Sequence, residues 1–529
     1  MYILNDIEWT FKQPFGQMTF ARQNMRNYFD VIVIGAGGSG LAAACSAAEF
    51  GGRVLVLEKR PQPGGTTGIA VGSFTAAGTI WQRKTGIDDN PLAHDEDAGK
   101  FARPEIEARN NHQLRQWFLH HSAETLEWLA GFGLSFVGPF PEPPNRVPRM
   151  HNVVPGAKAY VATLQLAVQQ AGGTLLCGAE VQDLLQDGGR VVGVRVNVQG
   201  ESREFHAACG VILAAGDYAS SADLIARHKG ERFRQIEGIN PFASGDGHRL
   251  AARVGARLEN MDITYGPELR FVTRSKKPFR QWLSVWGFLT KWIGRLTRWA
   301  PKRIMQAAIK RLLVTWQHPE DSLFTDGAIL LNQHGQRFVN ENAWPDREIA
   351  VASQSDKVAW ILLDNRLTQH FSAWPHFIST APEIAYAYVD DYRRLRPDVT
   401  HSAASLELAA ERAGLPTVEV RKTVECFNRY ISGKVPDEFG RTGDTHPIQN
   451  GPCVLLGPVK AYFTTTEGGA TVNERLQVIE NRGCVIPGLY AVGQNGLSGM
   501  VLWGHGLHIA WAMTSGRLAG RFVMEDSKH

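Results

Sequence analysis

The chain has 529 residues, which is longer than one hydrophobic core usually serves and predicts two or three domains. Hydrophobic residues make up 43% and charged residues 20%, a composition typical of soluble globular proteins. No run reaches the roughly 18 to 20 uninterrupted apolar residues of a membrane-spanning helix, which argues against one. The net charge of +4 comes from one segment, because residues 269–319 hold twelve Lys or Arg and no Asp or Glu, and the remainder carries −8.

The cysteines and the first residues bear on the compartment. Residues 1–28 have no charged-then-apolar pattern with a cleavage site, so we expect a cytoplasmic protein. Wide cysteine spacing without a CxxC pair predicts reduced thiols and no zinc or iron–sulfur site, so no metal is expected. The six cysteines are Cys45, Cys177, Cys209, Cys426, Cys453 and Cys484.

The first predicted elements form a strand–helix–strand unit. The apolar run Asp30–Ile34 leads into glycines, as a buried parallel strand does. The Ala-rich stretch Leu41–Phe50 predicts a helix that ends at Gly51, and Arg53–Glu58 predicts a second buried strand. Together they make a βαβ unit of about 30 residues.

A GxGxxG pattern joins that strand to that helix: Gly35-Ala36-Gly37-Gly38-Ser39-Gly40. Gly35 permits a tight turn, Gly37 lets the backbone approach a pyrophosphate, and Gly40 lets helix and strand pack closely. The helix N-terminus offers N–H donors to phosphate groups. Glu58 ends the second strand 18 residues after Gly40, placed to accept from ribose hydroxyls, so we predict a dinucleotide site.

Further strands follow, and the pattern then changes. Residues 160–170 predict a helix, residues 174–185 and 191–198 predict a hairpin, and residues 210–215 predict another buried strand. Residues 261–451 lose the strand–glycine–helix rhythm, and it returns at residues 489–520. We therefore expect a nucleotide domain in two parts, 26–260 and 452–529, interrupted by a cap domain at 261–451.

The glycine pair and hydroxyls after Lys59 resemble the second phosphate loop of flavoproteins. This segment and six later ones form an ordered set: Pro63–Gly68, Ala179–Val181, Val211–Gly216, Ser244–Gly247, Gly335–Glu341, Leu489–Gly493 and Ala512–Gly520. In this order the segments resemble the FAD-binding fumarate reductase / 3-ketosteroid Δ1-dehydrogenase superfamily. The likeness covers nearly the whole chain except residues 270 to about 320.

The resemblance implies an α/β fold: a Rossmann-like, glutathione-reductase-type FAD-binding domain interrupted by an α+β cap. Histidyl-linked FAD in this superfamily needs a His in the loop after the glycine pair, and Gly64–Gly78 has none, so noncovalent FAD is implied. The implied cofactor-binding residues are Gly35, Gly37, Gly38, Ser39, Gly40, Glu58, Lys59, Gly64, Gly65, Thr66, Thr67, Gly68, Val181, Ala214, Ala215, Gly216, Asp246, Gly493, Gln494, Leu507 and Ile509.

Three places depart from the fumarate branch. Tyr265-Gly266-Pro267 stands where that branch has His-Pro-Thr, and Thr465–Gly469 stands where it has His-Thr-Met-Gly-Gly. Its carboxylate-binding Arg in the C-terminal glycine loop falls on Trp503. Because a dicarboxylate needs bidentate cationic partners, reduction of a dicarboxylate is disfavoured.

The C-terminal loop, residues 502–506, is more similar to the ketosteroid branch, which has Tyr-Pro-Gly-x-Gly there. In that branch the Tyr hydroxyl and the second Gly N–H hold the substrate carbonyl. Gly506 is retained and the Tyr is Leu502, so we expect His505 to supply the missing donor or to exchange a proton.

The roles of several other candidate residues are open to more than one interpretation. Arg347 resembles the proton-shuttling Arg of the cap, with two residues inserted in the spacing, or it is a structural charge. Tyr265, where the chain enters the cap, is catalytic or part of the core. Glu467 is a site group or a turn carboxylate, His508 is expected to pack at the flavin, and His151 is left open. The predicted catalytic residues are therefore His505, Arg347, Tyr265 and Gly506.

The basic insert, residues 270–319, repeats Trp and aliphatic residues at helical spacing from 279 to 317, with Pro301 between two predicted amphipathic helices. One reading is contact with an anionic membrane surface, which would place the protein at the inner face of the membrane. The other is packing on the cap or on another subunit. No nucleic-acid motif accompanies these residues, so no nucleic-acid partner is expected.

The sequence therefore predicts an FAD-dependent oxidoreductase that transfers a hydride between flavin N5 and a carbon–carbon bond next to a carbonyl. The expected substrate is a small hydrophobic molecule, such as a steroid-like ketone that is dehydrogenated. One alternative is fumarate-reductase-like reduction of an unsaturated carboxylic acid, with Arg347 as proton donor. Another is a membrane-associated flavoprotein without turnover.

Overall fold

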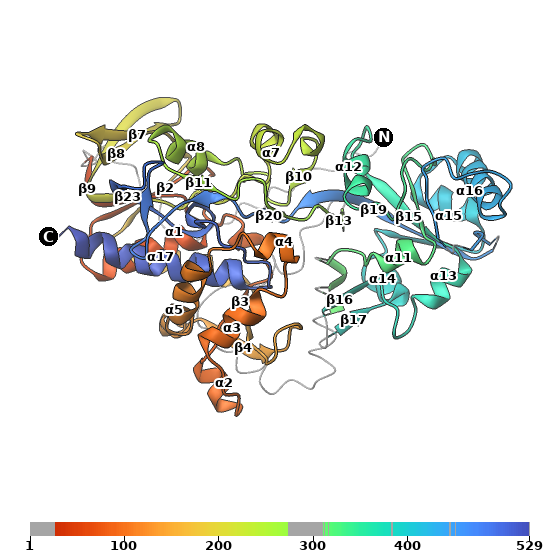
Figure 1. Cartoon of the computed structure of the whole chain (residues 1–529), viewed down its shortest axis with the longest axis horizontal. Helices are drawn as coiled ribbons and strands as arrows, with labels where there is room; N and C mark the ends of the chain where they lie inside the picture. The colour runs from red at the N-terminus through yellow and green to blue at the C-terminus, as the bar shows by residue number, and fades with distance from the viewer. Residues whose placement is uncertain are drawn as a thin grey trace, which may run out of the picture.

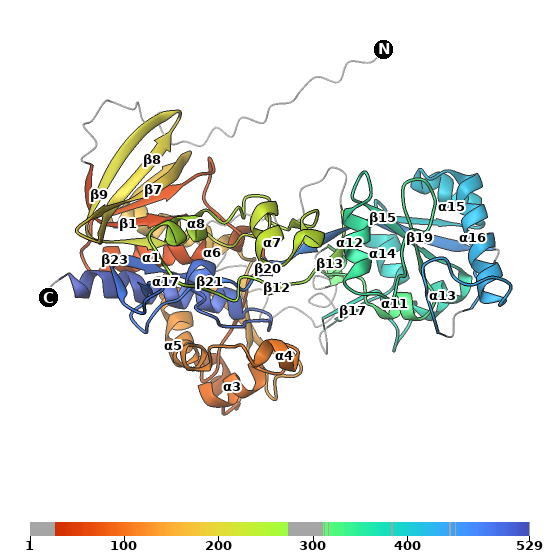
Figure 2. The same cartoon turned by 45° about the horizontal axis from the view of Figure 1, so that its top comes forward.

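A computed structural model describes residues 27–272, 310–311, 313–315, 317–381, 385–443, 446–449 and 451–527. Two α/β bodies lie side by side, one holding the first and last elements of the chain and the other holding middle elements (Figures 1 and 2). The amphipathic helices expected at 279–317 lie outside the described residues except for a few positions from 310 onward. Among the described residues, no helix is both long and apolar enough to cross a membrane.

The nucleotide domain is built on an eight-stranded sheet whose main path runs β22-β23-β9-β1-β2-β6, with β7 and β8 attached to β9. β1 pairs in parallel with both β2 and β9, and β9 pairs in parallel with β23 from the C-terminal part. This confirms a nucleotide fold completed by the end of the chain. The strands are β1 (Tyr28–Ile34), β2 (Val54–Glu58), β6 (Thr174–Cys177), β7 (Ala179–Asp187), β8 (Arg190–Val198), β9 (Glu201–Leu213), β22 (Gln477–Ile479) and β23 (Val485–Ala491).

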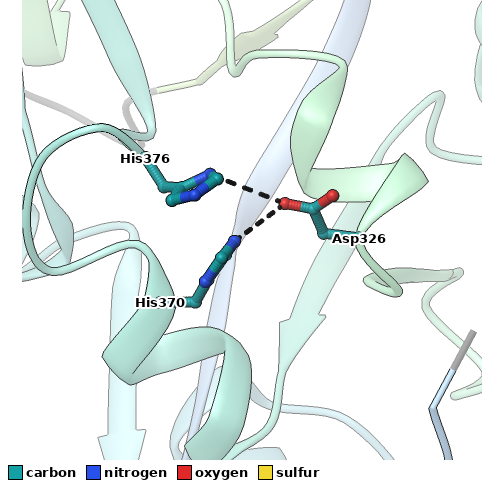
Figure 3. A group of neighbouring side chains, drawn as sticks. All are labelled: Asp326, His370 and His376. Atoms are coloured by element: carbon teal, nitrogen blue, oxygen red, sulfur yellow. Dashed lines mark hydrogen bonds and ion pairs between the residues drawn. The ribbon is translucent and has the colours of Figure 1, made fainter.

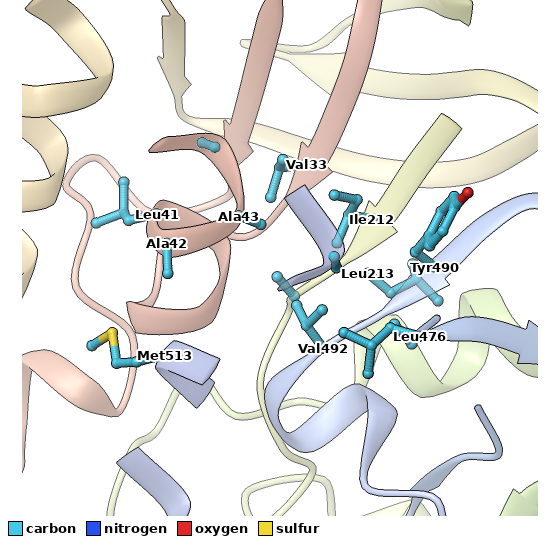
Figure 4. Close-up of a cluster of buried hydrophobic side chains, with 14 of the residues drawn as sticks. Val33, Leu41, Ala42, Ala43, Ile212, Leu213, Leu476, Tyr490, Val492 and Met513 are labelled. Carbon is cyan, nitrogen blue, oxygen red and sulfur yellow. The ribbon is translucent and has the colours of Figure 1, made fainter. Parts of the chain in front are cut away.

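Two helices from opposite ends of the chain pack against each other beside this sheet: α1 (Gly38–Glu49) and α17 (Leu507–Asp526) (Figure 1). Small residues allow this close approach, because a Cβ at Gly516 would lie 2.3 Å from the Ser39 carbonyl oxygen. Around them, apolar side chains such as Val33, Ile212 and Met513 form the buried core (Figure 4). Burying each such large side chain stabilises the fold by about 1.5–3 kcal/mol.

Further elements cover the nucleotide domain near the start of α17. Two buried ion pairs link parts of this layer, since Arg149 contacts Asp89 at 2.7 Å and Asp97 at 2.6 Å. The elements are β3 (Ser73–Thr75), β4 (Ser135–Phe140), β5 (Met150–Val154), α2 (Ile80–Lys84), α3 (Pro91–Ala98), α4 (Pro104–Glu107), α5 (His112–Gly131) and α6 (Lys158–Gln170).

The cap domain has its own six-stranded sheet, whose central strand is β19 (Cys453–Phe463). Alternate residues of its strands face opposite sides, so Leu455 and Leu456 enter two different cores and helices cover both faces. The other strands are β10 (Glu237–Gly238), β13 (Glu268–Phe271), β14 (Ile329–Leu331), β15 (Ala359–Leu363) and β18 (Thr400–Ala403). The helices are α11 (Ser322–Thr325), α12 (Asp346–Ala352), α13 (Asn365–His370), α14 (Val389–Leu395), α15 (Leu406–Ala413) and α16 (Thr417–Ile431).

The strand pairing in this sheet differs from the predicted domain boundaries at 260/261 and 451/452. β19 lies after residue 451 and β10 lies before residue 261, yet the two pair in parallel within the cap. The boundaries were misplaced because a fully buried strand looks alike in either sheet, whichever domain it joins. Two short antiparallel pairs lie where the chain passes between the domains after α8: β11 (Leu258–Glu259) with β21 (Gly469–Ala470), and β12 (Thr264–Tyr265) with β20 (Thr465–Thr466).

Candidate functional site

A large cavity runs through the nucleotide domain and reaches the cap. It is lined by the βαβ unit, the loop at 65–73, the end of β9, the strands that enter the cap and the loop before α17. Helix α8 (Asp246–Arg253) supplies Asp246 and Leu250 to its lining, whereas α7 (Ala222–His228) supplies no lining residue. The cavity thus joins most of the segments that the sequence marked as cofactor-binding.

The first end of the cavity suits a pyrophosphate. Helix α1 starts after Gly37, and no side chain of the described residues caps its N-terminus, so its first N–H groups face the cavity. Gly65, at φ +53°, brings the second loop against the first, since a Cβ there would lie 3.1 Å from Gly37 Cα. A Cβ at Gly38 would lie 2.6 Å from Thr67 Oγ1. Only glycines leave this space for phosphate oxygens.

The adenosine side is organised by Glu58, whose carboxylate is buried and lines the cavity. One oxygen accepts the N–H of Ala36 at 2.9 Å and the other accepts that of Arg60 at 3.0 Å. Lys59 contacts Asp246 at 2.7 Å, and both line the cavity. These contacts hold a carboxylate where ribose hydroxyls would donate, so the residues present fit FAD.

Most of the predicted cofactor residues line the cavity, and four do not: Gly40, Gly64, Gly68 and Leu507. Gly40 packs instead, because a Cβ there would lie 1.9 Å from the Gly35 carbonyl oxygen. Gly64 donates to the Ala36 carbonyl at 2.9 Å and accepts from Gly68 at 2.8 Å. These residues shape the glycine loops rather than face the cavity, and Leu507 is a buried residue at the start of α17.

Asn495 is a structural residue of the site that the sequence did not reveal. Its side chain accepts the N–H of Ala215 at 2.7 Å and donates to the Gly216 carbonyl at 2.9 Å. It therefore joins the end of β9 to the C-terminal glycine loop. A Cβ at Gly247 would lie 2.3 Å from it, which explains a glycine in α8.

The predicted catalytic residue His505 lies at the opposite end of the cavity and is paired with Glu142, which the sequence did not reveal. Its Nδ1 and its backbone N–H both contact the same Glu142 oxygen, the latter at 2.9 Å. Burial lowers the pKa of His505, and the hydrogen bond and charge of Glu142 outweigh it, so the pKa is raised. His505 lines the cavity, and about half of its side chain (52%) is exposed.

Gly506 and Tyr265 lie beside this pair and also line the cavity. Gly506, at φ +86°, precedes α17, so the positive end of a long helix faces this region. Thr75 Oγ1 donates to the His505 carbonyl at 2.6 Å and fixes the loop. The Tyr265 ring meets Trp503 edge-on at 5.7 Å, and burial raises the pKa of Tyr265.

The cap contributes a permanent cation, Arg270, in β13. It contacts Glu268 at 2.8 Å and Thr464 Oγ1 at 3.1 Å, and all three line the cavity. Burial raises the pKa of Glu268, but the charges of Arg270 and His318 outweigh burial, so the pKa is lowered. The carboxylate therefore stays charged and neutralises the guanidinium.

A second His–Glu pair lies at the first turn of α17. His508 lines the cavity, and its Nε2 lies 2.9 Å from Glu467 Oε1. Glu467 is fully buried, and its other oxygen has no hydrogen-bond partner among the described residues. Nearby, burial raises the pKa of Asp217 to about 6 despite the opposing charge of His508.

Arg347 is not brought together with the other predicted catalytic residues. It lies in α12 and does not line the cavity. Its guanidinium contacts Glu348 and Asp321, each at 2.6 Å, and stacks on Phe324 at 4.4 Å. These partners satisfy the charge inside the cap, which accounts for its orientation.

His151, left open by the sequence, does not line the cavity either. It is buried, and its Nε2 lies 3.0 Å from Thr79 Oγ1. Burial lowers the pKa of His151 to about 4, so the residue is a neutral core histidine.

Comparison with known proteins places this site in context. The sequence matches the family described as FAD binding domain over residues 30–277 and 299–504. Fumarate reductase (cytochrome) of Shewanella frigidimarina is 26% identical over 94% of this chain and 77% of its own. Vinyl phenol reductase of Lactiplantibacillus plantarum is 25% identical over 96% of this chain and 98% of its own. NADH:fumarate oxidoreductase of Klebsiella pneumoniae is 26% identical, and this chain spans 44% of its length.

Solved structures give the same fold. The open conformation of a flavocytochrome c3 fumarate reductase matches with a TM-score of 0.70 and 23% identity, over 95% of this chain and 79% of that one. The 3-ketosteroid delta1-dehydrogenase from Sterolibacterium denitrificans matches with a TM-score of 0.61 and 17% identity, over 94% of this chain and 100% of that one. At these identities the likeness establishes the fold alone.

Proposed function

The chain belongs to the FAD binding domain family, in the superfamily of fumarate reductases and ketosteroid dehydrogenases, and on this premise we propose its substrate class. This FAD-dependent oxidoreductase acts on a carbon–carbon bond next to a carbonyl group of a small, neutral, hydrophobic molecule. The single observation that carries the proposal is the His505–Glu142 pair beside Gly506, at a cavity end whose permanent cation is already neutralised.

The charges at this end favour a neutral substrate. Among the described lining residues there, the permanent cation is Arg270, and Glu268 occupies it at 2.8 Å. A carboxylate substrate would have to displace Glu268 or share the guanidinium with it, which costs electrostatic free energy. A neutral carbonyl compound meets no such competitor.

The walls favour a hydrophobic substrate. Aromatic and aliphatic side chains face the same end of the cavity, and polar groups are few and specific. The apolar lining residues are Phe140, Pro141, Met150, Tyr265, Leu313 and Trp503. A ring-containing compound would cover these surfaces and place its carbonyl oxygen among the polar groups of the 504–506 loop.

Proton transfer falls to His505. When bound, FAD supplies hydride acceptance or donation at its N5 atom. Because Glu142 holds Nδ1, Nε2 of His505 remains for the substrate, where it gives or takes the proton on the carbon or oxygen next to the reacting bond. The backbone N–H of Gly506 and the helix behind it favour negative charge developing on the carbonyl oxygen.

A second candidate function is reduction of an unsaturated carboxylic acid. Arg270 favours it, since it brings a cation to the cavity that could bind one carboxylate if Glu268 moved. Several relatives bear matching names, among them urocanate reductase of Eggerthella lenta. In this reading His505, rather than Arg347, lies where a proton donor is needed.

Anaerobic titration of the flavin separates these functions. Neutral acceptors such as an enone steroid or a smaller cyclic enone should reoxidise the reduced flavin, while fumarate and urocanate should not. Oxidised flavin should bleach with the matching saturated ketone. Reoxidation by the carboxylates alone would overturn the proposal in favour of the second function, and no spectral change with any compound would favour a flavoprotein without turnover.

A further inference from the structure

Three side chains with metal-ligating atoms meet in the cap, away from the cavity: Asp326, His370 and His376 (Figure 3). Asp326 follows the short helix α11, and His370 is the last residue of α13. One oxygen of Asp326 lies 3.1 Å from Nε2 of His370 and 3.8 Å from Nδ1 of His376. The potential ligand atoms all lie within 4.8 Å of one another.

We propose that these residues bind one divalent transition-metal ion, with Zn²⁺ as the best match, in the cap domain. Two imidazoles and a carboxylate make a nitrogen-rich set that suits Zn²⁺ and its first-row neighbours better than Mg²⁺ or Ca²⁺. A site with three protein ligands leaves a fourth position for water.

The geometry of the group supports a shared ion. Bonds of about 2.0–2.1 Å to a tetrahedral Zn²⁺ place ligand atoms roughly 3.3 Å apart. The Asp326–His370 distance of 3.1 Å already meets that spacing, and the Asp326–His376 distance of 3.8 Å is slightly longer. Small side-chain rotations would therefore complete the site.

The position of the two imidazole rings relative to each other also supports one shared metal ion. The centroids of His370 and His376 are 3.6 Å apart and their planes differ by 31°. Both rings point toward Asp326 from the same region, as two ligands of one shared ion must (Figure 3).

The surroundings hold the ligands in place. Phe371, a buried residue, contacts both rings, with centroid distances of 5.3 Å to His370 and 5.9 Å to His376. Arg366 donates to the backbone carbonyl of Asp326 at 2.7 Å. Such outer contacts orient the ligands of a metal site and reduce the entropy lost on binding.

Metal binding at this site would also restrict the cavity wall at the substrate end. His376 precedes a short stretch whose carbonyls accept from two segments: Ile378 accepts the Glu320 N–H at 2.9 Å, and Thr380 accepts from Gln317 at 3.0 Å. Gln317 and its neighbour His318 line the cavity. An ion that fixes His376 therefore also fixes this part of the cavity wall.

Equilibrium dialysis of the FAD-loaded protein tests the proposal. After treatment with EDTA, wild-type protein should bind one Zn²⁺ per chain from ZnCl₂ and should not bind Mg²⁺ from MgCl₂ at the same concentration. His370→Gln and His376→Gln should each reduce bound zinc to less than a tenth of an equivalent. The matched control is His334→Gln, an exposed histidine of the same domain, which should bind like wild type.

Folding of each variant is checked by its FAD content and by its melting temperature in EDTA, which should equal those of wild type. ZnCl₂ should then raise the melting temperature of wild type and of His334→Gln only. The proposal is overturned if EDTA-treated wild type takes up no stoichiometric zinc. It is equally overturned if the folded His370→Gln and His376→Gln variants bind as much zinc as wild type does.

Discussion

His505 contacts one Glu142 oxygen twice, through its ring Nδ1 and through its backbone N–H at 2.9 Å. The carboxylate thereby fixes both the ring and the loop that carries it. The residues are 363 positions apart in the sequence, so the loop before α17 and the segment after β4 must both be in place before the pair exists. The ring presents Nε2 to the cavity only while this double contact holds.

Removal of the ring should slow chemistry without removing the cofactor. We expect His505→Gln to lower the rate of flavin reoxidation by the best substrate about 100-fold, the usual contribution of a general acid. Stopped-flow absorbance under anaerobic conditions measures this rate. An unchanged rate would exclude His505 as the proton donor.

Removal of the carboxylate should change the pH dependence. Glu142 raises the pKa of His505 against the effect of burial, so Glu142→Gln should lower that pKa. A histidine acid is lost as the pH rises through its pKa, so the high-pH limb of the reoxidation rate should move to lower pH. Glu204→Gln, on the exposed β8–β9 surface, should leave the limb in place. A limb that does not move in Glu142→Gln would contradict the assignment.

Cofactor affinity should depend on Glu58. Its carboxylate accepts the Ala36 N–H at 2.9 Å and faces the cavity, so Glu58→Ala removes a charged acceptor from the site. Hydrogen bonds to charged groups contribute about 1.5–3 kcal/mol, which predicts roughly 10- to 150-fold weaker FAD binding. Fluorescence titration of the apoprotein with FAD gives the affinity, and Glu201→Ala on an exposed strand is the control. Equal affinities of the two variants would refute this role.

Gly40 should be intolerant of a methyl group. A Cβ there would lie 1.9 Å from a backbone oxygen, Gly35 O, which cannot move without opening the phosphate loop. Gly40→Ala should therefore destabilise the protein by about 1–3 kcal/mol or more and reduce its FAD content. Gly131→Ala, at a helix end where a Cβ meets nothing within 4 Å, should keep wild-type stability and FAD content. Urea denaturation and flavin absorbance measure both, and equal behaviour of the two variants would contradict the packing argument.

Acid should destabilise the protein through buried neutral histidines. Burial lowers the pKa of His248 to about 4, below the value near 6.5 of an unfolded chain. The unfolded state then binds the proton first, so the stability contributed by this group is present above pH 6.5 and is lost as the pH falls toward 4. The loss is on the order of 3 kcal/mol. Burial also lowers the pKa of His94 to about 3 and that of His151 to about 4, so both residues should add to the loss of stability in acid.

Urea midpoints between pH 7 and pH 4.5 check this prediction. His248→Gln should be less stable than wild type at pH 7, because Gly468 and Asn495 lose their contacts with the ring. It should also lose less stability on acidification, since one of the titrating groups is gone. His334→Gln is the exposed control, and a His248→Gln slope identical to that of wild type would contradict the assignment.

Sequence reasoning succeeded where the determinants are local. The strand, the glycines from Gly35 to Gly40 and Glu58 lie within one short unit, and the backbone conformation alone dictates those residue types. The packing role of Gly40 follows from the same local backbone, since a Cβ there would lie 1.9 Å from the Gly35 carbonyl oxygen.

The sequence did not predict features that depend on contacts between segments far apart in the chain. Glu142 carries no periodic or motif signal, and only the fold brings it to His505. β10 and β19 are apolar or very short, and their sequences do not encode which sheet they join. Arg347 has the right residue type near the expected position, but Glu348 and Asp321 hold it inside the cap.

The packing of α1 against α17 also sets an order for biosynthesis. The first helix of the nucleotide domain, α1, finds its partner α17 only after about 460 further residues have been translated, and strand β9 finds β23 only after about 270. During that interval the apolar flank of α1 lacks its native cover, whereas the cap sheet is complete once β19 has left the ribosome. A nascent chain should therefore fold its cap first and acquire FAD last, and in the meantime it is a natural client for chaperones.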